Sequence, residues 1–417
     1  MADLSLKYGD QQAVHLHLSD DIVLADLAGP AATPLDDPVA AAAAALADPI
    51  HFPPLTQATV PGDRIVLALD HGVPRAAAVV AGVVQSLLEG YAEPANIKLV
   101  RASGGRSSPL SDPLGLLPSS VREAIEVLLH DPRDTKTMSY LAASRDAHPI
   151  YMNRTIFDAD VVIPIGTLRL QESLNYLGVH GGLFPAFSDQ ETLERFRAID
   201  AEDWQAHQQR CRKESAEAAW LLGTQLTVQV VPGPGESLLH ILAGDPEAVA
   251  KHGRRLCEAA WRHEVPRRAN LVIAAIEGGQ EQQTWHNLAR ALHAASRIVS
   301  EEGTIVLCTQ LAVPPGPALR RLATADEDRA LERTLQRQRS ADALPAWMLL
   351  EARRNSRVLL LSQLDGETVE DLGLGFVEQA EDIDRLGRQH DSCILLANAQ
   401  HACPVPREEQ EQWLALH

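Results

Sequence analysis

The chain has 417 residues, of which 45% are hydrophobic and 22% charged, and its formal net charge is -19. A chain of this length exceeds what one hydrophobic core usually organises, so we expect two domains. An acidic surface of this size repels phosphate backbones, which argues against nucleic acid as a partner and otherwise serves solubility.

The start of the chain and its cysteines indicate a cytoplasmic protein. The first 18 residues lack the basic start and apolar core of a secretory signal, and the apolar run at 39–47 is too short to span a bilayer. The five cysteines are scattered and form no C-x-x-C pair, which argues against a disulfide framework or a zinc knuckle. We therefore expect no membrane association, and the sequence leaves homo-oligomerisation open.

The amino-terminal part predicts a hairpin followed by a parallel sheet. Apolar and polar residues alternate at 13–18 and at 21–27, as in two antiparallel strands. Asp37 before Pro38 is typical of a helix start. Strands then alternate with helices, which predicts a parallel sheet that ends at residue 166. The predicted strands are 64–70, 96–102 and 159–166, and the predicted helices are 75–88 and about 119–129.

The pattern continues and then restarts after a break. Residues 189–222 have a helical period, and a strand at 224–231 and a helix at 246–262 follow. Beyond residue 265 the predicted strands are 270–279, 304–311, 358–364 and 392–400, with a helix at 284–300. We predict an α/β protein of two lobes, each a mainly parallel sheet flanked by helices, with domains at 1–264 and 265–417 and the last residues packed back on the first lobe. Ligands of open α/β sheets bind at the carboxyl ends of strands, so a ligand is expected between the lobes.

The first strand end carries Asp70, His71 and Arg75. A carboxylate, an imidazole and a guanidinium could converge there on one anion, since an arginine binds a carboxylate through two parallel hydrogen bonds. The alternative is that Asp70 caps the next helix and Arg75 is a solvated residue of its first turn.

Two further strand ends carry glycine pairs. Gly181 and Gly182 follow His180, and Gly278 and Gly279 end the strand at 270–279; closely spaced glycines allow a cofactor to approach the backbone. His180 is a candidate general base or metal ligand, although a lone histidine is more often structural. Asn287 and Arg290 share one face of the following helix and could bind an oxyanion, or be ordinary exposed residues.

Several segments in order along the chain resemble the lactate racemase family, whose enzymes use a nickel pincer nucleotide. The resemblance rests on YGD at 8–10, LADPIHFPPLTQATVPGDRIVLALD at 46–70, HDPRD at 130–134, HPIYMNRTIFDADVVIPIG at 148–166, AGDPEA at 243–248 and NLVIAAIEGG at 270–279. It implies a two-lobed fold with cofactor and substrate in the cleft.

The resemblance also implies chemical groups that this chain lacks. The family tethers its cofactor to a lysine beside the glycine pair, but no lysine lies between Lys136 and Lys213. The segment that carries one catalytic histidine corresponds to ASGGRSS at 102–108, and the second falls in RLQESLNYLG at 169–178; neither contains histidine. The nickel-ligating histidine should follow SDQET, yet none occurs before His207. The pincer cofactor is therefore doubtful, and a metal ligand set remains unknown.

Some binding groups are retained in type. The resemblance places Arg75 at the substrate-carboxylate arginine and matches Asn287 and Arg290 to a glutamine and a lysine spaced three apart. We expect a divergent member that binds, or racemises or epimerises, a small 2-hydroxy acid, with His71 or His180 as acid/base. The alternatives are a sensor or partner subunit without catalysis, and a protein in which a differently bound metal or an untethered nucleotide replaces the pincer.

Overall fold

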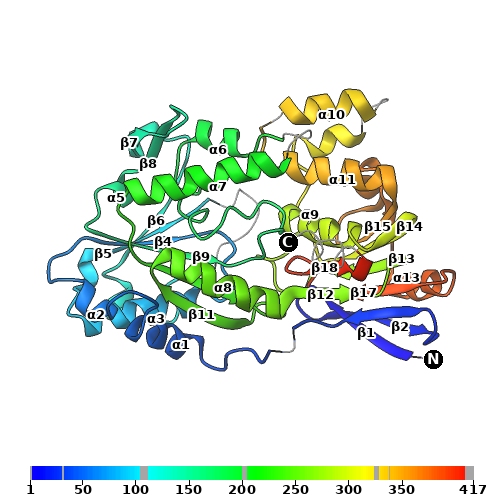
Figure 1. Cartoon of the computed structure of the whole chain (residues 1–417), viewed down its shortest axis with the longest axis horizontal. Helices are drawn as coiled ribbons and strands as arrows, with labels where there is room; N and C mark the ends of the chain where they lie inside the picture. Colours follow the sequence, from blue (N-terminus) through cyan, green and yellow to red (C-terminus); the bar gives the residue numbers. More distant parts are fainter. Residues whose placement is uncertain are drawn as a thin grey trace.

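The computed structural model describes residues 2–30, 32–103, 111–199, 204–323, 328–337 and 339–408. Within these residues the chain forms two lobes side by side, each built on a six-stranded, largely parallel sheet with helices against it (Figure 1). This confirms the predicted fold class.

The first sheet has the order β11-β10-β9-β4-β5-β6, in which β11 is antiparallel to β10 and the other pairs are parallel. Its strands are β4 (Ile65–Leu69), β5 (Ile97–Arg101), β6 (Glu126–Leu129), β9 (Val161–Thr167), β10 (Thr227–Pro232) and β11 (Leu238–Gly244). All five residues of β4 are buried, as expected of a central parallel strand that is covered on both faces.

Helices cover both faces of this sheet. The first face carries α1 (Pro38–Ala47), α2 (Leu55–Ala58) and α3 (Ala76–Glu89), and the second carries α5 (Arg154–Phe157), α6 (Gln190–Phe196) and α7 (Trp204–Leu221), with α8 (Pro246–Trp261) against β10 and β11. Asp37 caps α1 as predicted, because its Oδ1 accepts hydrogen bonds from the backbone N–H groups of Val39 and Ala40 at 3.0 Å.

The second sheet is parallel throughout, with the order β16-β15-β14-β13-β17-β3. Its strands are β3 (Val23–Leu27), β13 (Ala269–Ala275), β14 (Val299–Cys308), β15 (Arg357–Leu361), β16 (Gly375–Phe376) and β17 (Cys393–Leu396). The helices α9 (Trp285–Ser296) and α11 (Ala343–Asn355) share a core with one face, whereas the hairpin of β1 (Ala2–Tyr8) and β2 (Gln12–Leu18) and the helix α13 (Ala380–Gly387) cover the other.

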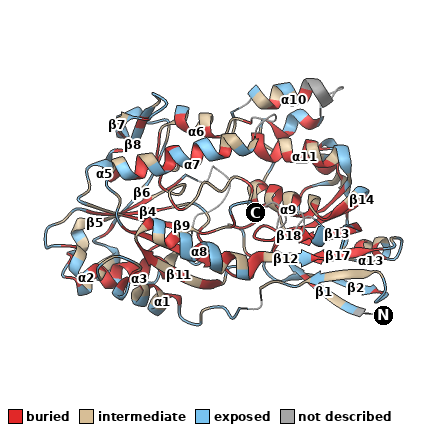
Figure 2. Ribbon diagram, in the orientation of Figure 1, coloured by how far each residue is buried: buried red, intermediate tan, exposed pale blue. Residues whose placement is uncertain are grey.

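The smaller elements complete the lobes. The hairpin of β7 (Met138–Ala143) and β8 (Pro149–Asn153) lies beside α5, and β12 (Arg262–Val265) pairs with β18 (Cys403–Pro406). The remaining helices are α4 (Ser119–Arg122), α10 (Asp328–Arg337) and α12 (Gly366–Asp371), and the 3-10 turns are Pro94–Asn96, Thr135–Thr137 and Leu319–Ala323. Buried residues concentrate in the two sheets and on the inner faces of the helices (Figure 2).

The structure corrects three predicted elements. The predicted hairpin of 13–18 with 21–27 is wrong, because β2 pairs with β1 while β3 joins β17 in the second sheet. The strands β1, β2 and β3 therefore pack with the second sheet. The predicted helix at 119–129 is the single turn α4 followed by the edge strand β6. The first sheet also continues past residue 166, through β10 and β11.

Candidate functional site

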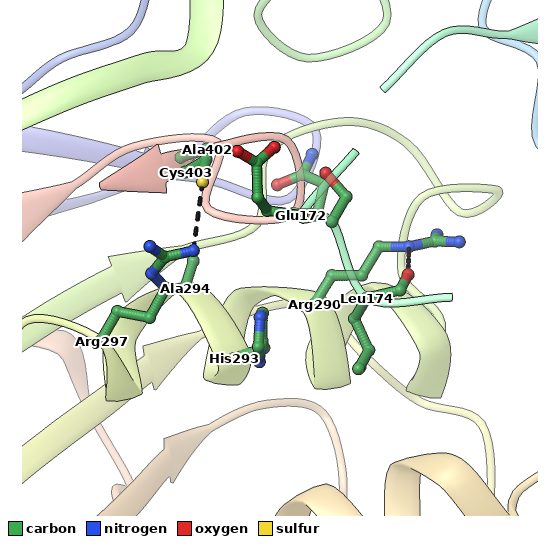
Figure 3. A pocket seen from close by; sticks show the side chains of 10 residues that line it. Glu172, Leu174, Arg290, His293, Ala294, Arg297, Ala402 and Cys403 are labelled. Carbon is green, nitrogen blue, oxygen red and sulfur yellow. Dashed lines mark hydrogen bonds between the residues drawn. The ribbon is translucent and has the colours of Figure 1, made fainter. Parts of the chain in front are cut away.

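Charged side chains from both lobes meet where the lobes touch. Asp70 follows β4 and Arg169 follows β9, so both stand at the carboxyl edge of the first sheet. Arg290 faces them from α9 of the second lobe, since its charge affects the pKa of Asp70. A narrow cavity at this junction is lined by Glu172, Ser173, Leu174, Arg290, His293, Ala294, Arg297, Gln400, Ala402 and Cys403 (Figure 3).

Asp70 is the carboxyl group whose charge acts on both guanidinium groups. Burial raises the pKa of its carboxyl group, against the opposing effects of the His71 N–H, which donates to Oδ1 at 2.7 Å, and of the charges of His71, Arg169 and Arg290. A β-carbon at Gly182 would lie 2.9 Å from the Asp70 Oδ2 atom, so only glycine lets this loop approach the carboxylate. The structure thus brings Gly182 against Asp70, and both were predicted as site residues.

Arg169 is a site residue that the sequence interpretation missed. Its Nη1 donates to the Gln400 carbonyl oxygen at 3.2 Å and to His401 Nδ1 at 3.0 Å, which joins the first lobe to the loop after β17. Burial lowers the pKa of its guanidinium group, although arginine remains protonated in proteins. The only signal in the sequence was its place in IGTLRL at 165–170, two residues after the end of β9.

Arg290 is held by its own helix and by the other lobe. Its Nε donates to the Leu174 carbonyl oxygen at 3.3 Å, and its Nη1 donates to Asn287 Oδ1 at 2.9 Å (Figure 3 shows the first of these). Asn287 in turn donates to the Gln282 carbonyl oxygen at 2.8 Å. Burial, then the neighbouring Arg169, lowers the pKa of Arg290 well below its usual range. Asn287 therefore positions Arg290, a role different from the expected contact with a ligand.

The histidines around this cluster are held neutral. Desolvation is the main cause in each case: it lowers the pKa of the buried His401, of the half-buried His286 to about 3, and of His71, which lies at the surface. The positive charge of Arg290 adds to the effect at all three. The cluster therefore contains two cationic arginines, one carboxyl group and neutral imidazoles.

The remaining predicted residues are not part of this cluster. Arg75 is exposed at the start of α3 with a φ of 52°, and its side chain makes no hydrogen bond or ion pair with the described part of the chain. His180 is partly buried, which lowers its pKa, and the charge opposing that shift is Asp245 at the start of α8. His71 instead faces Asp70 and Glu281. The two histidines thus have different charged neighbours.

The backbone N–H groups of the second glycine pair, Gly278 and Gly279, already donate to other residues of the protein. The Gly278 N–H donates to the Gly9 carbonyl oxygen at 2.8 Å, and the Gly279 N–H donates to Glu236 Oε1 at 3.2 Å. A β-carbon at Gly278 would lie 2.7 Å from Gln282 Cγ, so this glycine serves the packing of its own turn. Neither N–H is free for the cofactor that we expected there.

The donor set does not fit a lysine-tethered nickel cofactor. No lysine lies beside the glycine pair at 181–182 in the sequence, where the nearest are Lys136 and Lys213. Within the described ranges, no three histidine, cysteine, aspartate or glutamate side chains are grouped so as to hold a metal ion. Of the segments where the resemblance implied histidines, 104–108 and 200–203 lie outside the described residues.

Comparison with known proteins agrees with this architecture. Residues 8–207 match the family described as lactate racemase N-terminal domain. The lactate racemase apoprotein from Thermoanaerobacterium thermosaccharolyticum superposes with a TM-score of 0.79 over 97% of this chain and 100% of that one, at 15% identity. The chain therefore has the fold of that lactate racemase, and its residues 8–207 resemble the family's amino-terminal domain.

A second structure supports the same fold for this lactate-racemase-like chain. A protein from Thermotoga maritima matches with a TM-score of 0.62 at 14% identity, covering 82% of this chain and 93% of that one. The comparison with curated proteins found no match. Among the described helices, none has the length and apolar character needed to cross a bilayer.

Proposed function

We propose that this lactate-racemase-like chain binds a small 2-hydroxy acid, or a related carboxylate, between its lobes. The observation that carries the proposal is the charge balance of the junction: among the described residues, Asp70 is the one carboxyl group whose charge acts on both Arg169 and Arg290. A guanidinium group in a partly buried place is costly without a counter-charge, and a ligand carboxylate supplies one.

We propose that the chain binds this ligand but does not racemise it by means of a tethered nickel cofactor. Proton transfer at one carbon requires acid and base groups within hydrogen-bond reach of it. The candidate pair, His71 and His180, faces different charges, and the lysine for a tether is missing. A ligand sensor or partner subunit is therefore favoured over a racemase.

Isothermal titration of the full chain with L- and D-lactate tests binding. Arg290→Gln should weaken binding at least about tenfold, because hydrogen bonds to a charged group contribute about 1.5–3 kcal/mol. The matched control is Arg385→Gln, since the Arg385 side chain is 72% exposed and forms an ion pair with Asp382 on its own helix. Equal affinity in both variants would count against the site.

Hydrogen exchange at C2 tests the catalytic alternative. Lactate incubated with the protein in D₂O, followed by NMR and chiral chromatography, should show neither deuterium at C2 nor the opposite enantiomer. Exchange at a rate that depends on His71 or His180 would replace the binding proposal with an enzyme.

A further inference from the structure

The Gln400 side chain ends in a buried acceptor that the protein does not use. Gln400 is 2% exposed and lines the same cavity as Arg290. Its Nε2 donates to the Glu277 carbonyl oxygen at 3.0 Å, whereas its Oε1 has no hydrogen-bond partner among the described residues. Because the Glu277 carbonyl can only accept, the orientation of the amide is fixed and Oε1 is its free end.

The neighbouring His401 adds a free donor. Its Nδ1 accepts from Arg169, which can only donate, so the proton of the neutral ring is on Nε2. That Nε2 also lacks a partner within the described chain, although His401 is only 4% exposed. Buried polar groups are normally hydrogen-bonded, because one without a partner destabilises the fold. An acceptor on Gln400 and a donor on His401, both without a partner among the described residues and close to Arg169 and Arg290, therefore indicate a ligand-binding surface.

We infer that Gln400 is the residue that distinguishes hydroxy acids from plain carboxylic acids; this rests on the proposed function. The ligand carboxylate pairs with the guanidinium groups, and the hydroxyl at C2 donates its hydrogen to Gln400 Oε1. A carboxylate without that hydroxyl leaves Oε1 unmet and binds less tightly. The cavity, at about 10 Å³, holds no more than a water molecule, so a three-carbon acid enters when the lobes separate.

The test compares lactate with propionate by isothermal titration of the full chain. The unaltered protein should bind lactate about three- to tenfold more tightly, as expected for one neutral hydrogen bond. Gln400→Met keeps the length of the side chain without its oxygen, and should bring the affinity ratio to about one.

Gln283→Met is the matched control. Gln283 is also 2% exposed, but its Oε1 is filled by Thr309 Oγ1 at 2.6 Å and by the Gln310 N–H at 2.9 Å. This variant should lower stability and leave the lactate preference intact. If Gln400→Met keeps the preference, or Gln283→Met loses it equally, the assignment is overturned.

A measurement on the unaltered protein keeps the test independent of folding of the variants. 2-Fluoropropionate has an acceptor at C2 but no donor, so it should bind like propionate; affinity equal to that of lactate overturns the role of Oε1. Equal binding of lactate and propionate rejects the inference and leaves the carboxylate site standing. Binding of neither acid rejects both.

Discussion

Asp70 makes the charge of the junction depend on pH. Its carboxyl pKa is raised chiefly by burial, and its negative charge acts on both Arg169 and Arg290. Protonation of this group leaves the two guanidinium groups without their shared counter-charge. The site therefore becomes more positive as the pH falls, while a hydroxy acid remains ionised.

We expect lactate to bind several-fold more tightly at pH 5.5 than at pH 8. Protonation of His71 also adds positive charge to the site, but at a lower pH, because its pKa is lowered. Asp70→Asn should bind at pH 8 about as tightly as the unaltered protein does at low pH, and its affinity should vary less with pH. Titrations at four pH values check this, and weaker binding in acid would contradict it.

Single residues also show where prediction from the sequence stopped. Asp70 and Arg290 were predicted from their places after a strand and on a helix face, and both lie at the junction. Arg169 was missed because its partners, Gln400 and His401, lie 231 and 232 residues away. Gln400 carries no local pattern at all, since an unmet acceptor is a property of packing and not of spacing.

At the scale of elements, local pattern predicted strands and helices better than it predicted partners. The buried runs of β4, β9 and β13 were all predicted as strands. The alternation at 21–27 did predict a strand, but alternation cannot tell an antiparallel neighbour from a parallel one in another sheet. The turn α4 was taken for a long helix because β6 at the sheet edge has an irregular burial pattern.

The cap of α9 offers a prediction about the helix that carries Arg290. Thr284 Oγ1 accepts from the Asn287 N–H at 3.1 Å. Thr284→Ala should lower the free energy of unfolding by about 1 kcal/mol, because a first-turn N–H loses its partner. Thr284→Ser keeps the hydroxyl and should lose much less. Urea unfolding of both variants checks this; equal losses would show that the methyl group, and not the cap, matters.

At the scale of the molecule, the first described strands of the chain complete the carboxyl-terminal lobe. The β1–β2 hairpin buries Leu6, Val14, Leu16 and Leu18 against Leu271, Ile273 and their neighbours in the second sheet. The core of the second lobe is thus completed by contacts between residues more than 250 positions apart, and it depends on the first 27 residues.

Leu16→Ala should therefore destabilise the second lobe. Leu16 is fully buried, and truncation of a buried leucine typically lowers the free energy of unfolding by about 2–5 kcal/mol. His15→Ala on the exposed face of the same strand is the control and should change stability little. Urea unfolding compares the two, and similar losses would mean that the hairpin is not part of this core.

Neutral buried histidines should make the whole fold sensitive to acid. Desolvation lowers the pKa of eight histidines in the described chain, with His293 at about 4 and His286 at about 3; the others are His71, His130, His180, His240, His263 and His401. In the unfolded chain a histidine titrates near pH 6.5, so below that pH the unfolded state binds more protons. Stability is then complete above about pH 6.5 and falls as the pH drops toward the folded values.

Asp70 and Asp26 oppose this trend, because burial raises their pKa and the folded state takes up their protons more readily. Because eight histidines act in one direction and two aspartates in the other, the fold loses stability overall as the pH falls. Each neutral histidine contributes about 1.4 kcal/mol per pH unit, so His293→Gln should flatten the decline by about that amount between pH 6 and 5. Urea unfolding from pH 8 to 5 measures it, with His15→Gln at an exposed position as the control. A stability independent of pH, or equal flattening by His15→Gln, would mean that the buried imidazoles do not set the acid limit of the fold.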